Sequence, residues 1–204
     1  MTAIPRAGVM SPVLIAGCAI VMVSFAIRAG FGLFQIPIAD EFGWLRSEYS
    51  LAIAIQNLAW GFGQPIFAMV AERWGDRKAL ALGALTYAVG LALSASATSP
   101  EGHQMLNVLV GFGIAGTGFG VILSMVGRAT PEAQRSVALG IATAAGSAGQ
   151  VVGPPVIERL LAVMPLPEVF LTLAGIALAI LLILPLMRAP QRPAGPAVED
   201  PFLT

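Results

Sequence analysis

One cation, Arg28, stands near the middle of an apolar stretch that runs from residue 12 to residue 38. A charge at the centre of a membrane helix costs between about 3 and more than 10 kcal/mol unless a partner compensates for it. The six apolar segments of the chain, defined below, carry no Asp or Glu away from their ends. The partner of Arg28 could therefore be an anionic ligand or a residue of a missing half; alternatively, Arg28 has a structural role in which carbonyls and nearby Gln or Ser side chains satisfy the guanidinium.

Polar side chains recur at helical spacing around this cation. Ser24, Arg28, Phe31 and Gln35 follow one another in steps of four, three and four residues, so an unbroken α-helix would place them on one face. Polar side chains at membrane depth turn toward protein or a water-filled path. The predicted ligand-binding set is Arg28 with Ser24, Gln35, Gln56, Asn57, Thr117, Thr143, Ser147 and Gln150.

Six apolar segments supply the elements that must position these side chains. The chain has 204 residues, of which 57% are hydrophobic and 11% charged, whereas a soluble domain carries roughly 25% charged residues. Each segment is long enough to cross about 30 Å of hydrocarbon as a helix, and none alternates as a membrane β-strand does. The sequence thus predicts an all-α membrane protein with six transmembrane helices, at about 12–38, 49–70, 79–98, 104–127, 136–157 and 168–187.

Two flanking segments complete this organisation. Residues 1–11 form a short N-terminal segment, and residues 188–204 form a polar, Pro-rich tail that reads as a flexible linker. The loops on one side of the predicted bundle hold eight Lys and Arg residues and those on the other side hold two. Under the positive-inside rule, this difference predicts a multi-pass protein of the inner (plasma) membrane with both termini in the cytoplasm.

Composition excludes several classes of function. A single cysteine, Cys18, rules out a disulfide scaffold. Eleven basic and eleven acidic residues, without a basic stripe, argue against nucleic acid as a partner. A membrane enzyme is disfavoured because His103 stands alone in a loop and no nucleophile–base pairing is evident. We expect no metal and no cofactor.

The polar residues are unevenly distributed among the predicted helices. The segments 12–38, 49–70, 104–127 and 136–157 each carry a stripe of polar or small residues, whereas 168–187 has only Thr172. The first four are therefore expected to surround a polar path, and the last to face lipid. The pair Gly116 and Gly120, four residues apart, predicts close helix packing.

Two further patterns suggest moving parts. The loop between the second and third helices is short, contains Gly75, and carries both signs of charge, in Glu72, Arg73, Asp76, Arg77 and Lys78. Positive-inside topology would explain its basic residues but not its acidic ones. In the fifth helix, Gly149 and Gly153 precede Pro154 and Pro155, and the two prolines should bend or end the helix. The result would be a plain kink, or a pivot or seal against a neighbouring helix. We expect Glu72, Arg73, Gly75, Asp76, Arg77, Gly149, Gly153 and Pro154 to take part in conformational change.

The 68–78 loop resembles the signature Gly-x-Leu-Ala-Asp-Arg-x-Gly-Arg-Arg of the major facilitator superfamily. Arg73, Gly75 and Arg77 fit this signature, while Ala68, Glu72 and Asp76 depart from it. The run from Gly149 to Pro154 looks like the family's fifth-helix Gly-Pro motif. The stretches 41–65 and 135–147 look like its bacterial monocarboxylate-transporter-like branch. The resemblance covers about residues 10–190, which correspond to the first six helices of a family that normally has twelve.

This resemblance implies the N-terminal half of a major facilitator fold and a role in transport. It implies secondary active transport of a small organic anion, similar to a monocarboxylate, by alternating access, as symport or antiport. A truncated or half transporter is expected to need a second half or a second copy, within a lipid bilayer. The alternative is a truncated membrane remnant with no activity of its own.

Overall fold

The computed structural model describes residues 10–188, which fold into helices connected by short turns. The predicted N-terminal segment 1–11 and the tail 188–204 lie almost wholly outside these described residues. In chain order the elements are α1 (Pro12–Ala29), η1 (Gly30–Phe34), α2 (Gln35–Phe42), α3 (Arg46–Trp74), α4 (Asp76–Ser94), α5 (Pro100–Thr117), α6 (Phe119–Ala129), α7 (Glu132–Val163), α8 (Leu166–Ile183) and η2 (Leu184–Leu186).

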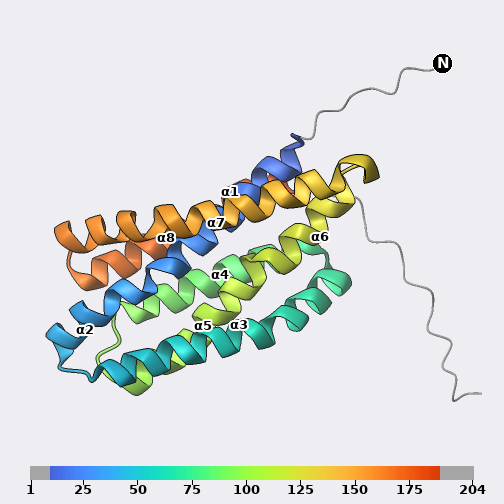
Figure 1. Cartoon of the computed structure of the whole chain (residues 1–204). Helices are drawn as coiled ribbons and strands as arrows, with labels where there is room; N and C mark the ends of the chain where they lie inside the picture. Colours follow the sequence, from blue (N-terminus) through green and yellow to red (C-terminus); the bar gives the residue numbers. More distant parts are fainter. Residues whose placement is uncertain (1–9, 189–204) are drawn as a thin grey trace, which may run out of the picture.

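These elements form six rods that run alongside one another (Figure 1). The first rod joins α1, η1 and α2, the fourth joins α5 and α6, and the sixth joins α8 and η2. The described residues contain no β-strand, and the predicted all-α fold is confirmed. Each rod contains most of one predicted segment, and its ends lie within about six residues of the predicted ones.

Four rods are long and apolar enough to cross a membrane: Pro12–Phe42, Pro100–Ala129, Glu132–Val163 and Leu166–Leu186. The other two, α3 and α4, lie among them in the same bundle (Figure 1). Polar residues within α3 and the charged first turn of α4, which begins with Asp76, Arg77 and Lys78, make these two rods less apolar.

Local sequence explains where two of the rods begin. Ser11 precedes Pro12, and the Ser11 hydroxyl accepts a hydrogen bond from the N–H of Leu14 at 3.1 Å. Ser99 and Pro100 repeat this arrangement at the start of α5, where Gly102 N–H donates to Ser99 Oγ at 3.2 Å. In both cases serine satisfies a free N–H of the first turn and proline needs none.

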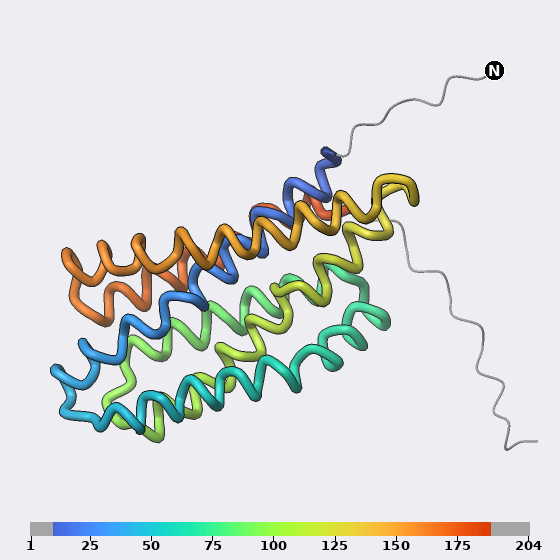
Figure 2. The backbone as a smooth tube through the Cα atoms, in the orientation of Figure 1, coloured from blue at the N-terminus to red at the C-terminus, as the bar shows by residue number. Residues whose placement is uncertain are grey.

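The rods pack in pairs, and the backbone tube shows α1 beside α7 and, separately, α3 beside α5 (Figure 2). The helix α1 packs along α7, and α3 packs along α5, which also contacts α4. The helix α8 packs mainly against α4 and leaves Leu171, Leu178 and Leu182 exposed. Glycines let two helix backbones approach closely between α4 and α5: a Cβ on Gly83 of α4 would lie 2.6 Å from the Cα of Gly116 in α5.

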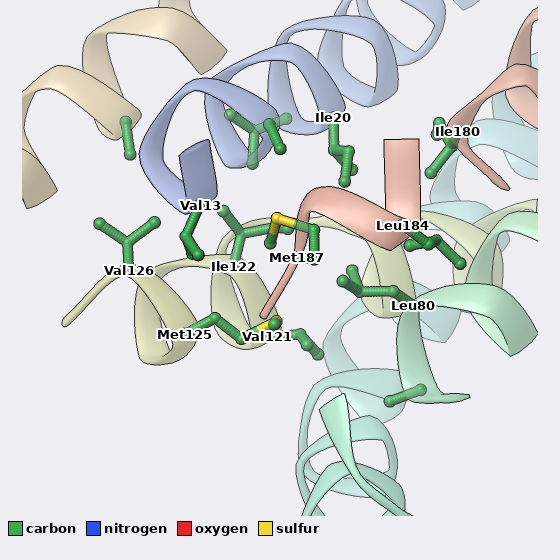
Figure 3. Close-up of a cluster of buried hydrophobic side chains, with 14 of the residues drawn as sticks. Val13, Ile20, Leu80, Val121, Ile122, Met125, Val126, Ile180, Leu184 and Met187 are labelled. Atoms are coloured by element: carbon green, nitrogen blue, oxygen red, sulfur yellow. The ribbon is translucent and has the colours of Figure 1, made fainter. Parts of the chain in front are cut away.

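The buried apolar side chains form two clusters, one toward each end of the bundle. One cluster contains residues near the start of α1, in α6 and at the end of the sixth rod, such as Val13, Met125 and Leu184 (Figure 3). The other contains aromatic residues toward the opposite end, including Phe34 and Phe170, whose ring centroids are 4.6 Å apart. On the first rod the two clusters meet between Phe25 and Ile27, next to Arg28.

Candidate functional site

Arg28 lies in the last turn of α1 and reaches across to α3. Its Nη2 donates a hydrogen bond to Asn57 Oδ1 at 2.8 Å, and its guanidinium carbon lies 4.5 Å from the centroid of the Trp60 ring. The Nε–H is buried without an acceptor in the described part of the chain. No carboxylate of the described residues forms an ion pair with Arg28. The cation is therefore held by a neutral amide and an aromatic face.

Asn57 is oriented for this contact by its own helix. Its Nδ2 donates to the carbonyl oxygen of Ile53 one turn earlier, at 2.8 Å, which leaves its Oδ1 to accept from Arg28. Trp60 lies three residues after Asn57, so both side chains lie on one face of α3. The indole Nε1–H of Trp60 is also buried without an acceptor among the described residues.

A second polar contact lies one turn before Arg28. Ser24 Oγ and Thr117 Oγ1 are 2.8 Å apart, and both side chains are completely buried between α1 and α5. Thr117 donates to the carbonyl oxygen of Gly113, so its own proton is engaged and Ser24 acts as the donor to Thr117. Tyr87 Oη of α4 donates to the carbonyl oxygen of Ser24 at 3.3 Å. Ser24 and Thr117 thus join three rods beside the cation.

Both rods that meet at this contact depart from regular α-helix there. The first rod changes to a 3-10 helix over Gly30–Phe34, which begins two residues after Arg28. The fourth rod breaks at Gly118, where an extended residue (φ −87°, ψ −164°) separates α5 from α6. Irregular backbone at membrane depth is tolerated where protein or a cavity surrounds it. Each break thus follows a residue of this region: the 3-10 segment follows Arg28, and Gly118 follows Thr117.

The structure separates the other predicted ligand-binding residues. Gln56 is 1% exposed and donates to Asn107 Oδ1 at 3.0 Å, inside the contact between α3 and α5. Gln35 donates to Ser50 Oγ at 3.0 Å, at the join between the first two rods. The prediction that Ser24, Arg28 and Gln35 share one unbroken helical face is wrong beyond Gly30, because η1 winds more tightly than an α-helix.

Three predicted residues lie on α7, away from the Arg28 contact. Thr143, Ser147 and Gln150 are exposed along one face of that helix. The hydroxyls of Thr143 and Ser147 donate to carbonyl oxygens one turn earlier in the same helix. The described structure thus brings Arg28 and Asn57 together, with Ser24 and Thr117 beside them, and leaves the α7 residues on an open face.

The predicted conformational residues fall into two places. Gly75 has φ +96°, a value that favours glycine, and it joins α3 to α4 without a loop. Asp76 follows it and forms an ion pair with Arg128 at the end of α6, where Arg128 also donates to Ser124. Glu72, Arg73 and Arg77 are exposed around this join.

The second place is the contact between α7 and α1. The Cα atoms of Gly149 and Gly153 face the backbones of Met22 and Ala26 so closely that a Cβ at either glycine would collide with them. Pro154 and Pro155 do not end α7, which continues to Val163. The prediction that the two prolines could end the helix is therefore wrong, because α7 continues although neither proline has an N–H to donate.

Sequence reasoning missed three partners that the fold brings in. Trp60 and Arg128 belong to neither the predicted ligand-binding set nor the predicted conformational set. Asn107 was not singled out. Trp60 and Asn107 lie within predicted helices and Arg128 directly follows one, and their pairing depends on the contacts of α3 with α1 and α5 and of α4 with α6.

Comparison with known proteins agrees with this architecture. The family model of the Major Facilitator Superfamily matches residues 16–203. "Probable anion transporter 3, chloroplastic" of Arabidopsis thaliana is 26% identical over 156 residues, which are 75% of this chain and 30% of that protein. "Probable anion transporter 2, chloroplastic" of Oryza sativa subsp. japonica is 26% identical over 137 residues, or 66% of this chain and 25% of that protein.

A solved structure shows the same fold. The crystal structure of a bacterial homologue of the human lysosomal transporter Spinster, inward-facing and unoccupied, matches with a TM-score of 0.70 and 19% identity. The match covers 93% of this chain and 46% of that one. The chain thus spans about a third or less of the curated relatives and about half of the solved structure.

Proposed function

The chain belongs to the Major Facilitator Superfamily, and on that premise we propose that it binds a small organic anion at Arg28 as part of a secondary transporter. Family membership supports a role in membrane transport rather than in catalysis. The substrate class, the coupling and the action of a second half or second copy are parts of this proposal.

One observation carries the choice of an anion: Arg28 is a half-buried cation in the described bundle with no carboxylate partner. A guanidinium has five N–H donors in a planar fork that matches a carboxylate. Asn57 accepts only from Nη2, so further donors remain for a ligand. A carboxylate would supply the negative charge that Asn57 and Trp60 do not.

The names of the relatives support the same substrate class. Two curated plant proteins at 26% identity are described as probable anion transporters. Their names do not specify a carboxylate; the bidentate geometry of an Arg–carboxylate pair favours one. The choice of a monocarboxylate-like substrate therefore rests on this geometry and not on the names of the relatives.

Alternating access would use the tight and loose contacts of the bundle. The first and fifth rods touch through Gly149 and Gly153, so they should move as one body. The break at Gly30 follows Arg28 and the break at Gly118 follows Thr117, so both would give the site backbone that can rearrange. In the proposed arrangement both termini are cytoplasmic, the plasma membrane holds the bundle, and another six-helix body covers the exposed face of α7.

A ligand screen tests this proposal. The purified chain in nanodiscs is heated with acetate, lactate, pyruvate or benzoate, and separately with the corresponding neutral amides at equal concentration. We expect at least one carboxylate to raise the melting temperature while its amide does not, because only the anion compensates Arg28. Equal shifts with acid and amide, or no shift with any anion, would contradict the proposal.

A further inference from the structure

A second candidate site lies at the end of the bundle where α3 joins α4. A cavity of about 870 Å³ opens there between the end of α3, the first turn of α4, α6 and the end of the sixth rod. It shares no residue with the contact of Arg28, Asn57 and Trp60. Its chemistry can therefore be considered separately from that of the proposed transport site.

Basic side chains outnumber acidic ones around this cavity. Four cations line it, and they are Arg73, Arg77, Lys78 and Arg188. Two carboxylates, Glu72 and Asp76, also line it, and Asp76 is paired with Arg128, which is not part of the lining. Arginine forks and lysine charges are the side chains that proteins use to bind phosphate.

The backbone adds to this positive character. Gly75 turns the chain directly from α3 into α4, so the N-terminus of α4 borders the cavity. The N–H groups of Lys78 and Ala79 bond to the carbonyl oxygen of Gly75, whereas the N–H groups of the first two helical residues have no intrahelical acceptor. A helix N-terminus of this kind favours a negative group.

The floor of the cavity is apolar. Ala81, Met125, Leu184 and Met187 line it, and the last three belong to the buried cluster of Figure 3. A small hydrated anion would gain nothing from this floor, whereas the glycerol and upper acyl carbons of a lipid would cover it. Basic pockets at the ends of transmembrane helices are suited to anionic headgroups for this reason.

We propose that this cavity binds a phosphate group, with the phosphate among Arg73, Arg77, Lys78 and Arg188 and the rest of the molecule over the apolar floor. The shared chemistry is a phosphate ester, which either an anionic phospholipid or a soluble phosphate compound carries. The apolar floor favours the lipid. Since Asp76 borders the cavity and pairs with Arg128, occupancy would act on the contact between α4 and α6.

Native mass spectrometry of the purified full chain tests the proposal with two kinds of probe. One is dioctanoyl phosphatidic acid, with dioctanoyl glycerol as its phosphate-free counterpart; the other is inorganic phosphate or glycerol 3-phosphate. The altered proteins are the double variant Arg77→Gln/Lys78→Gln and the single variant Arg188→Gln, which leaves the α3–α4 join intact. The matched control is Arg46→Gln/Arg159→Gln, which removes two exposed cations away from the cavity.

We expect phosphatidic acid to bind wild type and the control, and the double variant to bind it at least about tenfold more weakly. Arg188→Gln should weaken binding severalfold with an unchanged melting temperature, which separates loss of the site from loss of the fold. Equally tight binding of glycerol 3-phosphate would support the phosphate site with a soluble source. Equal binding of dioctanoyl glycerol, equal loss in the control, or retention by both cavity variants would overturn the proposal.

Discussion

Arg28 of α1 and Asn57 of α3 meet across the bundle, with Nη2 donating to Oδ1 at 2.8 Å. The contact gives the guanidinium an acceptor but no negative charge. Trp60, one turn further along α3, covers its face. A cation held in this way is positioned by the fold and still lacks a counter-charge, which is the physical basis of the proposed anion site.

Replacing the neutral partner Asn57 by a charged residue should prevent an anion from binding at Arg28. In Asn57→Asp a carboxylate would stand where Oδ1 now lies and would pair with Arg28 permanently. We expect anion affinity to fall at least about tenfold and the melting temperature to stay or rise, because the charge is now compensated. Asn57→Ala, which removes the hydrogen bond without adding charge, should lower affinity only about threefold or less. Carboxylate titrations of both variants check this, and wild-type affinity in Asn57→Asp would count against it.

The glycine contact between α4 and α5 should be intolerant of any side chain. A Cβ on Gly83 would lie 2.6 Å from the Cα of Gly116, and this Cα belongs to a packed helix backbone that cannot yield easily. Gly83→Ala is expected to cost about 1–3 kcal/mol of stability. Gly61, with open space around it, serves as the control, and Gly61→Ala should be neutral or slightly stabilising. Thermal melting of the two variants, measured side by side, checks this. If Gly83→Ala were as stable as Gly61→Ala, the close packing of α4 against α5 would be refuted.

The ion pair of Asp76 with Arg128 should couple α4 to α6. The two side chains are only 13% and 18% exposed, so loss of either partner leaves a poorly solvated charge. We expect Asp76→Asn and Arg128→Gln each to destabilise the chain, with a coupling energy of about 1–3 kcal/mol in a double-mutant cycle. Strict additivity of the two single changes would show that the pair contributes nothing.

Orientation in the membrane is the prediction that rests on charge counts alone. Single cysteines at Ala3→Cys and Glu101→Cys, in a Cys18→Ser background, should label differently in intact cells. An impermeant maleimide should reach position 101 from outside but not position 3, because the positive-inside rule puts the termini in the cytoplasm. Labelling of position 3 from outside would reverse the assignment.

The helices were predictable because their signal is local. Apolar runs separated by charged or Pro- and Gly-containing turns predicted six rods, and the Ser-Pro pairs at 11–12 and 99–100 explain two of their starts. The 3-10 segment after Arg28 was not predictable, since Gly30–Phe34 is as apolar as its surroundings. Its tighter winding is what moved Gln35 out of the predicted face.

The candidate site was predictable only in part. Arg28 stood out because a charge in an apolar helix is costly, and Asn57 because it is polar at the same depth. The rotation of α3 about its own axis decides which of its polar residues face Arg28 and which face another rod. Composition does not encode that rotation. Gln56, next to Asn57 in sequence, consequently points to Asn107, whereas Trp60 packs on Arg28.

Anion affinity measured on Arg28 variants tests the central claim most directly. Isothermal titration of the carboxylate found in the ligand screen would compare wild type, Arg28→Lys, Arg28→Gln and the control Arg159→Gln, which removes an exposed cation near the end of α7. Arg28→Gln should lose binding at least about a hundredfold and Arg28→Lys about tenfold, because lysine keeps the charge but not the fork. Each variant should melt at or above the wild-type temperature, since a costly charge is removed or made easier to solvate, and the control should bind as wild type does. An Arg28→Gln protein that folds and binds the anion as tightly as wild type would contradict the account.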